Sequence, residues 1–213
     1  NSPPVHPWFR ADEPPVILGM GRMADQKNFP LLITAFAEVR RQRRVRLVIL
    51  GGDPSSAAEM AHRDELLSLA AQLGVAGDVE LPGFQNNRFR YLEAARLFVL
   101  SSDYEGFGNV LVEALIAGCP VVSTDCPSGP AEILKGGKYG RLVPVNDASH
   151  LARAMFESLD ENVAPEVLRK RGAEFSLDNA ISNYQAVLFS SGAIITAAES
   201  DLPIAAPSSA AIR

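Results

Sequence analysis

The feature that most constrains the fold of this chain is a repeated alternation between short apolar runs and longer stretches with helical spacing. The apolar runs lie at residues 16–20, 46–50, 79–81, 97–100, 120–123 and 140–143. The stretches with helical spacing lie at residues 29–43, 59–73, 88–95, 109–117, 129–134, 148–159, 164–171 and 177–189. Short, almost unbroken apolar runs are typical of strands that are buried on both faces of a sheet, because neither side of such a strand meets water.

Strands that alternate with helices form parallel sheets, because each helix carries the chain back to the edge from which the next strand starts. Because the apolar runs are continuous, we expect helices to cover both faces of the sheet. The crossovers are expected to be right-handed. We therefore predict an α/β fold with a doubly wound, parallel, Rossmann-like sheet of about six strands. Ligands of such sheets bind beyond the carboxyl ends of the strands, which directs attention to the loops between each strand and the next helix.

Composition supports a globular domain and excludes several other classes. Apolar residues make up 47% and charged residues 21%, which allows a core and excludes disorder throughout, collagen and a coiled-coil rod. The 20 basic and 25 acidic residues give a net charge of −5, whereas general nucleic-acid binding needs a basic face. No apolar run approaches the roughly 18–20 residues that span a bilayer. The only two cysteines, Cys119 and Cys126, are too few for a disulfide scaffold, and the three histidines lack the spacing of metal ligands.

Two of the strand-to-helix loops carry weak signals of a ligand site. The loop at residues 21–27 places Arg22 and Lys27 at the mouth of the sheet, either as an anion clamp or as two solvated surface charges. The next loop begins with Gly51 and Gly52, which permit close approach of the backbone to a ligand but serve a plain tight turn equally well. Neither a dinucleotide-binding fingerprint nor a P-loop occurs in the chain.

The loop at residues 101–115 is the most informative. Glu105 lies within the loop, and Glu113 lies about one turn into the helix that follows it. Gly106 and Gly108 let the backbone pass close to a ligand, and the start of the helix offers unpaired N–H groups and a partial positive charge that attract an anion. The two acids fit such a site if the amides meet a phosphate while the carboxylates accept hydrogen bonds from sugar hydroxyls. Glu113 could instead simply favour the helix dipole.

Two further features have interpretations that the residues alone leave open. In the loop at residues 125–132, Glu132 is either an acid in the first turn of a helix or part of a pocket wall. Five arginines gather at the end of one predicted helix: Arg40, Arg41, Arg43, Arg44 and Arg46. They offset the helix dipole, and the alternative is contact with an anionic membrane surface.

Glu105 and Glu113, separated by seven residues within EGFGNVLVEALIAGCPVV, resemble the E-x7-E motif of retaining GT-B glycosyltransferases of family GT4, glycosyltransferase group 1. Other blocks occur in the family's order: GRMADQKNF, LVILGGDP, VELPGF, ARLFVLSS, GPAEIL and GRLVP. The resemblance covers about residues 16–190. A complete GT-B enzyme has two Rossmann-like domains, and this chain resembles only the C-terminal half, which binds the donor.

The resemblance implies a role for each matching residue. Arg22 and Lys27 bind the donor diphosphate, Glu113 holds the ribose hydroxyls, and Glu105 contacts the transferred sugar. Arg22, Lys27 and Glu105 are the implied catalytic residues. The implied donor-binding residues are Gly21, Gly51, Phe84, Gly106, Phe107, Gly108, Asn109, Val110, Leu111 and Glu113. The amides of Asn109, Val110 and Leu111 are expected to face the phosphates.

The resemblance also implies a division of the chain. Residues 1–15, which are rich in proline, are expected to form a linker. Residues 16–176 are expected to form the nucleotide-sugar-binding domain, and residues 177–189 a helix that crosses back to the N-terminal acceptor domain, which this chain lacks. Residues 190–213, rich in alanine, serine and proline, are expected to be a flexible tail. Since the chain begins with Asn1 rather than Met, we expect it to be part of a longer protein.

The implied activity is transfer of a sugar from a nucleoside diphosphate sugar, of the UDP or GDP type, to a glycan, a lipid-linked molecule or another acceptor. The resemblance implies that the anomeric configuration is retained. No cofactor is implied, and we expect no metal, because the chain has no Asp-x-Asp pair for a divalent cation. Arg22, Lys27 and the helix start can supply the positive charge instead.

Alternatives to a glycosyltransferase stay open at this point. A stand-alone module that binds a sugar nucleotide without turnover is compatible with the missing acceptor domain, and a GT-B relative with other chemistry, such as an epimerase, is a third hypothesis. We expect a cytoplasmic protein without a nucleic-acid partner. Peripheral contact with the inner membrane face is an alternative, since many members of the family act on lipid-linked or envelope sugars.

Overall fold

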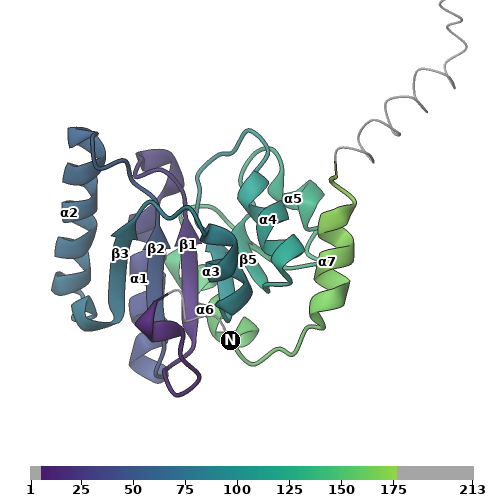
Figure 1. The fold of residues 1–213 in the computed structure, drawn as a ribbon, viewed down its shortest axis with the longest axis horizontal. Coiled ribbons are helices and arrows are strands. Elements are labelled where there is room, and N and C mark those ends of the chain that lie inside the picture. Colours follow the sequence, from purple (N-terminus) through teal and green to yellow (C-terminus); the bar gives the residue numbers. More distant parts are fainter. Residues whose placement is uncertain (1–5, 177–213) are drawn as a thin grey trace, which may run out of the picture. The chain divides into compact units, whose positions relative to one another are not determined.

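The computed structural model describes residues 6–176 of the 213-residue chain. The helix expected at residues 177–189 and the tail expected at residues 190–213 lie outside the described residues. The strands are β1 (Val16–Met20), β2 (Arg46–Leu50), β3 (Val79–Gly83), β4 (Leu97–Leu100), β5 (Val121–Thr124) and β6 (Arg141–Val143). All neighbours pair in parallel, and the six-stranded sheet has the order β3-β2-β1-β4-β5-β6. Figure 1 shows β3, β2 and β1 side by side. The predicted doubly wound α/β sheet is confirmed.

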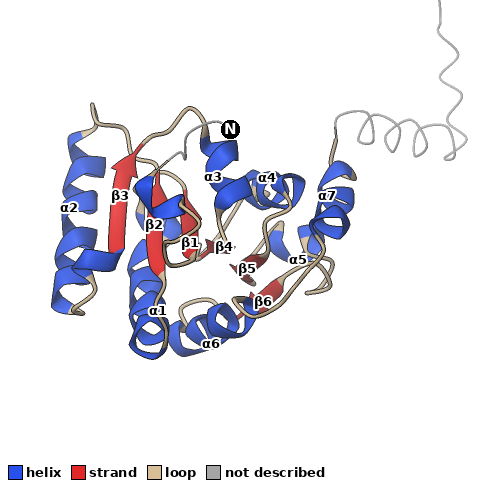
Figure 2. Ribbon diagram, turned by 60° about the horizontal axis from the view of Figure 1, so that its bottom comes forward, coloured by secondary structure: helices blue, strands red, loops and turns tan. Residues whose placement is uncertain are grey.

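Helices cover both faces of this sheet (Figure 2). They are α1 (Phe29–Gln42), α2 (Ala57–Gln72), α3 (Arg88–Ala94), α4 (Asn109–Ala117), α5 (Pro130–Ile133), α6 (Ala148–Ser158) and α7 (Pro165–Ala173), with 3₁₀ turns η1 (Pro7–Phe9), η2 (Asp25–Lys27) and η3 (Ala76–Asp78). Helices α1, α2 and α6 pack into the core on one face, and α3, α4, α5 and α7 into the core on the other. Within residues 6–176, none of the helices combines the length and the apolar character that crossing a membrane requires.

The apolar runs become strands because their alternate side chains enter two different cores. In β1, Ile17 points into the core that contains α1, and Leu18 points into the core that contains α4; both are fully buried. Gly19 keeps α1 close to the sheet, since an added Cβ would lie 2.7 Å from Cδ2 of Leu32. Truncating a leucine buried this completely costs about 2–5 kcal/mol.

The strand order positions the site. The chain runs from β1 outward to β2 and β3, then returns to the other side of β1 to add β4, β5 and β6. At the carboxyl ends of β1 and β4 the two connections therefore lead away in opposite directions, which opens a crevice between them. The loops that follow β1 and β4 border this crevice, and they carry the cations and acids that the sequence singles out.

Residues 6–15, expected as a linker, contact the folded domain at the opposite edge of the sheet. The guanidinium of Arg46, at the start of β2, lies 4.5 Å from the centroid of the Trp8 ring and forms an ion pair with Glu13 at 2.9 Å. Phe9 packs edge-on against Tyr91 of α3 with 5.4 Å between ring centroids. This segment therefore lies away from the crevice.

Candidate functional site

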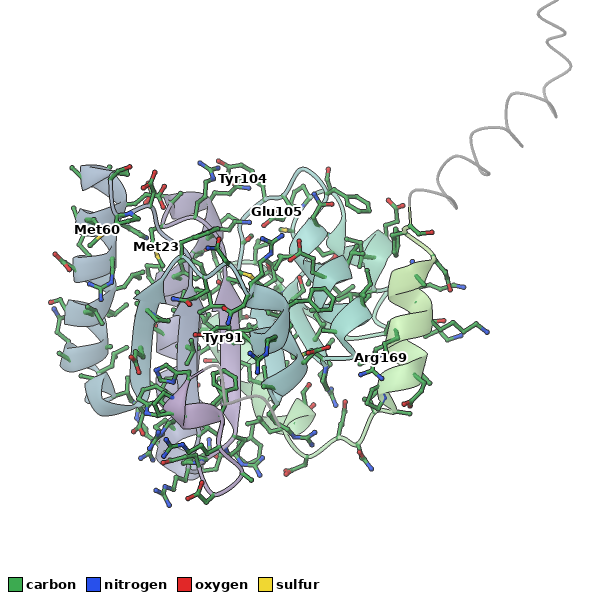
Figure 3. All side chains as sticks on the ribbon, in the orientation of Figure 1. Met23, Met60, Tyr91, Tyr104, Glu105 and Arg169 are labelled. Carbon is green, nitrogen blue, oxygen red and sulfur yellow. The ribbon has the colours of Figure 1, made fainter. Side chains whose placement is uncertain are left out.

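A pocket of about 840 Å³ opens at the carboxyl edge of the sheet. It is lined by the following residues that the sequence predicts for the site: Gly21, Arg22, Lys27, Gly51, Phe84, Glu105, Gly106, Phe107, Gly108, Asn109, Val110 and Glu113. Figure 3 shows Glu105, beside Tyr104, at this edge of the molecule. The structure thus brings the predicted residues together, while their individual roles stay predictions.

Leu111 is the predicted residue that does not line the pocket. Its side chain is fully buried, and its amide donates to the carbonyl of Gly108 at 2.8 Å. Asn109 and Val110 occupy the first two positions of α4 and do line the pocket. These two residues therefore form the part of the helix start that faces the pocket.

The loops after β1 and β2 are in direct backbone contact. Gly51 has a φ of +131°, and a Cβ added to it would lie 1.7 Å from the carbonyl oxygen of Gly21. In addition, Oε2 of Glu59, in the first turn of α2, accepts hydrogen bonds from the amides of Met23 at 3.0 Å and Asp53 at 3.3 Å. A single carboxylate thus connects two pocket loops, one of which carries Arg22.

The loops after β1 and β4 are also joined by hydrogen bonds. The amide of Asp103 donates to the carbonyl of Gln26 at 3.0 Å, and the Gln26 side-chain amide donates to the carbonyl of Tyr104 at 2.8 Å. The hydroxyl of Ser101 donates to the carbonyl of Lys27 at 2.7 Å. These bonds fix the position of Lys27 relative to the residues that precede Glu105.

Lys27 and Glu105 form an ion pair in the pocket wall. The Nζ atom of Lys27 lies 2.6 Å from Oε1 of Glu105, and the Ser102 hydroxyl donates to the same oxygen at 2.6 Å. The two charged side chains are only 14% and 8% exposed. Because burial strengthens the attraction and removes competing water, the pair holds the two loops together.

Arg22 stands in a different environment from Lys27. It is exposed at the pocket wall, and no carboxylate of residues 6–176 lies within ion-pair distance of its guanidinium. Its charge is therefore available to an anion in the pocket, and its planar fork suits the oxygens of a phosphate.

Glu113 is held by Arg88, the first residue of α3. Arg88 Nε donates to Oε2 at 2.9 Å and a terminal guanidinium nitrogen donates to Oε1 at 3.0 Å. Both residues line the pocket. This hydrogen bonding from Glu113 and the attraction of its negative charge raise the pKa of Arg88 above its usual range.

The loop after β5 packs against the loop that carries Glu105 but contributes no carboxylate to the pocket. A Cβ added to Gly129, which has a φ of +93°, would lie 1.6 Å from the carbonyl oxygen of Phe107, so this loop packs directly against the one that carries Glu105. Glu132 is an exposed residue in the first turn of α5 and does not line the pocket. Of the two interpretations, the helix-turn acid is therefore the one that fits.

The arginine cluster at the end of α1 is largely compensated by acids. Ion pairs join Arg40 to Asp78 at 2.6 Å, Arg43 to Asp160 at 2.8 Å and Arg46 to Glu13 at 2.9 Å. Arg41 and Arg44 are exposed. The pairing reduces the positive charge that this end of the domain presents to an anionic surface.

Both cysteines are free and buried. Burial raises the pKa of the Cys119 thiol to about 12 and, together with the nearby Glu105 charge, raises the pKa of Cys126. Thiols in such surroundings are inert. Residues 6–176 contain no cluster of three or more His, Cys, Asp or Glu side chains placed to hold a metal ion.

Together, the doubly wound sheet and the pocket at its switch point define an α/β domain of the Rossmann-like class, with both cations and carboxylates in the pocket wall. The family model of the glycosyl transferases group 1 matches residues 6–175. The chain belongs to this family, as the E-x7-E motif indicates.

Individual relatives agree with this assignment. An N-acetylgalactosaminyltransferase from Campylobacter jejuni, named for a diphospho-undecaprenol substrate, is 38% identical over 72% of this chain. A lipopolysaccharide core biosynthesis glycosyltransferase, LpsE of Rhizobium meliloti, is 38% identical over 75% of it. The chain spans 39% and 44% of the lengths of these two relatives, which is less than half of each.

Solved structures share the fold. The galactosyltransferase WaaB superposes with a TM-score of 0.72 at 23% identity, covering 85% of this chain and 50% of WaaB. Anabaena HepE, solved with UDP and glucose, gives 0.70 at 23% identity, covering 84% of this chain and 48% of HepE. At identities of 23%, this likeness shows the fold alone, which is the Rossmann-like domain of the GT-B type.

The sequence prediction of the site does not include Glu59 and Arg88, which line the pocket, or Ser102, which donates a hydrogen bond to Glu105. Glu59 stands in the first turn of a helix, where an acid has an ordinary structural explanation. Ser102 lies at the start of the informative loop, but a serine there is equally expected to cap a helix or form a turn. Arg88 lies 25 residues from Glu113 with no motif between them, so the sequence carries no signal for this pair.

Proposed function

We propose that this chain is the donor-binding half of a retaining, metal-independent glycosyltransferase. It binds a nucleoside diphosphate sugar, and the sugar goes to a glycan, a lipid-linked molecule or another acceptor. The observation that carries the proposal is the arrangement of one pocket, in which Arg22, Lys27 and the start of α4 stand beside the carboxylates of Glu105 and Glu113. Cations suit a diphosphate, and carboxylates suit the hydroxyls of the two sugars that flank it.

The names of related proteins support the same chemistry. HepE is described in complex with UDP and glucose. The relative from Campylobacter is named as a glycosyltransferase for a diphospho-undecaprenol substrate, and the one from Rhizobium as a glycosyltransferase of lipopolysaccharide core biosynthesis. The UDP type of donor is accordingly the first to test. The chain matches less than half of these relatives, so the acceptor would be bound by a further domain.

The pocket's charges fit the step in which the sugar is transferred. The bond between the anomeric carbon and the β-phosphate oxygen breaks, and its electron pair remains on the departing diphosphate. The acceptor oxygen bonds to the anomeric carbon and releases its proton. Arg22, Lys27 and the α4 dipole are in place before this charge develops, so they stabilise the transition state more than the ground state. Retention of configuration is implied by the family resemblance.

The ion pair between Lys27 and Glu105 has a part in donor binding. A diphosphate that enters the pocket attracts the Lys27 ammonium, which loosens its contact with Glu105. The Glu105 carboxylate is then available to accept hydrogen bonds from hydroxyls of the donor sugar. The same pair therefore keeps both groups oriented before the donor arrives.

Thermal unfolding of the 213-residue chain with a panel of nucleotides tests the proposal. UDP, GDP, their sugars and the corresponding monophosphates are compared at one concentration. At about 100 times the dissociation constant, one diphosphate is expected to raise the melting temperature by about 5–10 °C, and the monophosphate by less. A melting temperature that no nucleoside diphosphate changes would contradict the proposal.

A further inference from the structure

The Glu113 carboxylate, which is proposed to hold the donor ribose, already accepts hydrogen bonds from the guanidinium of Arg88. Both oxygens of Glu113 accept a hydrogen bond from Arg88, at 2.9 and 3.0 Å. The side chain of Glu113 is 27% exposed and that of Arg88 is 47% exposed, so the pair faces the pocket rather than the core. Two parallel N–H···O bonds fix the rotation of the carboxylate as well as its position.

The placement of Arg88 is unfavourable for a helix on its own. Arg88 is the first residue of α3, where the helix dipole repels a cation. Its side chain is nearly half exposed, so it contributes little apolar burial. The contact with Glu113, on the neighbouring helix α4, is what offsets the unfavourable position.

The geometry leaves the carboxylate able to bind a ligand. Each carboxylate oxygen has two lone pairs, and Arg88 uses one on each. One lone pair on each oxygen is left for a hydroxyl from the pocket side. Two neighbouring hydroxyls, such as those of a ribose, match two oxygens held in a fixed plane, whereas a carboxylate that rotates freely would lose entropy on binding them.

We propose that Arg88 is a positioning residue that orients Glu113 for the two ribose hydroxyls and thereby sets the preference of the site for ribonucleotides over deoxyribonucleotides. The inference rests on the proposed function, because it assumes a nucleoside diphosphate in the pocket. Lysine cannot replace the arginine fully, since an ammonium is a point charge and does not form two parallel bonds to one carboxylate.

The experiment compares affinities for ribose and deoxyribose forms of the same nucleotide. Calorimetry on the 213-residue chain measures the dissociation constants of UDP, 2′-deoxy-UDP and 3′-deoxy-UDP, or of the GDP series if GDP binds better. The variants are Arg88→Ala and Arg88→Lys, with Arg153→Ala as the control, because Arg153 is an exposed residue of α6. Arg88 is exposed enough for its variants to fold, which unfolding in urea verifies.

The ratio of the deoxy to the ribo dissociation constant is the diagnostic quantity. Loss of one hydrogen bond to a charged group gives a ratio of about tenfold or more in the unaltered chain. In Arg88→Ala this ratio is expected to fall to about twofold, with Arg88→Lys between the two and Arg153→Ala unchanged. An unchanged ratio in Arg88→Ala, or tighter binding of UDP by that variant, would overturn the inference while leaving the proposed function intact. Failure of the unaltered chain to bind any nucleoside diphosphate would overturn both.

Discussion

The ammonium of Lys27 lies 2.6 Å from a carboxylate oxygen of Glu105, although the two residues are 78 positions apart in the sequence. This contact joins the loop after β1 to the loop after β4 at the point where the strand order reverses. It brings a group proposed to bind phosphate into contact with one proposed to bind sugar. The pair is therefore both a structural tie and a part of the pocket.

Removing Lys27 alone should destabilise the domain. Lys27→Ala leaves the Glu105 carboxylate, 8% exposed, without its counter-ion. We expect a loss of about 1–3 kcal/mol in the free energy of unfolding, measured in urea. The double variant Lys27→Ala with Glu105→Gln should recover part of this loss, since the uncompensated charge is gone. If the loss in the double variant equals the sum of the losses in Lys27→Ala and in Glu105→Gln, the two residues are not coupled.

Glu113→Ala should weaken donor binding with little effect on folding. Glu113 is proposed to accept charge-assisted hydrogen bonds from the ribose, and their loss corresponds to about 10–100-fold in affinity. Calorimetry with the nucleoside diphosphate measures the change. Glu132→Ala is the matched control, because Glu132 is an exposed first-turn acid outside the pocket. Equal affinities of Glu113→Ala and the unaltered chain for the nucleoside diphosphate would show that Glu113 does not bind the donor.

Glu59→Ala should loosen the pocket from its other side. The variant loses the acceptor that holds the amides of Met23 and Asp53, so the loop that carries Arg22 gains freedom. We expect donor affinity to fall by about 3–10-fold, which corresponds to one hydrogen bond of about 1 kcal/mol. Glu65→Ala, on the exposed side of the same helix, is the control. If both variants bind the donor like the unaltered chain, Glu59 has no part in shaping the site.

Arg22→Ala should lower turnover more than donor binding in the enzyme that includes its acceptor domain. Arg22 is proposed to stabilise the charge that develops on the departing diphosphate, so kcat should fall by about 10²–10³-fold with a smaller change in the donor dissociation constant. Equal losses in kcat and affinity would mean that Arg22 binds the ground state as strongly as the transition state.

Activity of the same enzyme should survive addition of EDTA, because Arg22, Lys27 and the α4 dipole supply the positive charge. Abolition of activity by EDTA would contradict the metal-independent step.

The sequence predicts the architecture well because local patterns determine it. The apolar runs are long enough for strands and too short for helices, and each ends at a loop with glycine or proline. The small errors have local causes as well: β5 begins at Val121 rather than Pro120, since proline has no N–H to donate to the strand ladder.

The site is predicted only in part, because its contacts depend on tertiary structure. The strand-end rule brings together loops far apart in the chain, which accounts for Lys27 and Glu105 sharing one pocket. No local pattern indicates that Arg88 binds Glu113 or that Glu59 bridges two loops. The bond between the Leu111 amide and Gly108 likewise depends on how the first turn of α4 closes.

The most direct test of the central claim is a crystal structure of this chain with its preferred nucleoside diphosphate. The account predicts that the diphosphate lies between the Arg22 and Lys27 side chains and the first residues of α4, with the ribose hydroxyls on the Glu113 carboxylate. A nucleotide bound elsewhere, or bound in this pocket with its ribose turned away from Glu113, would contradict it.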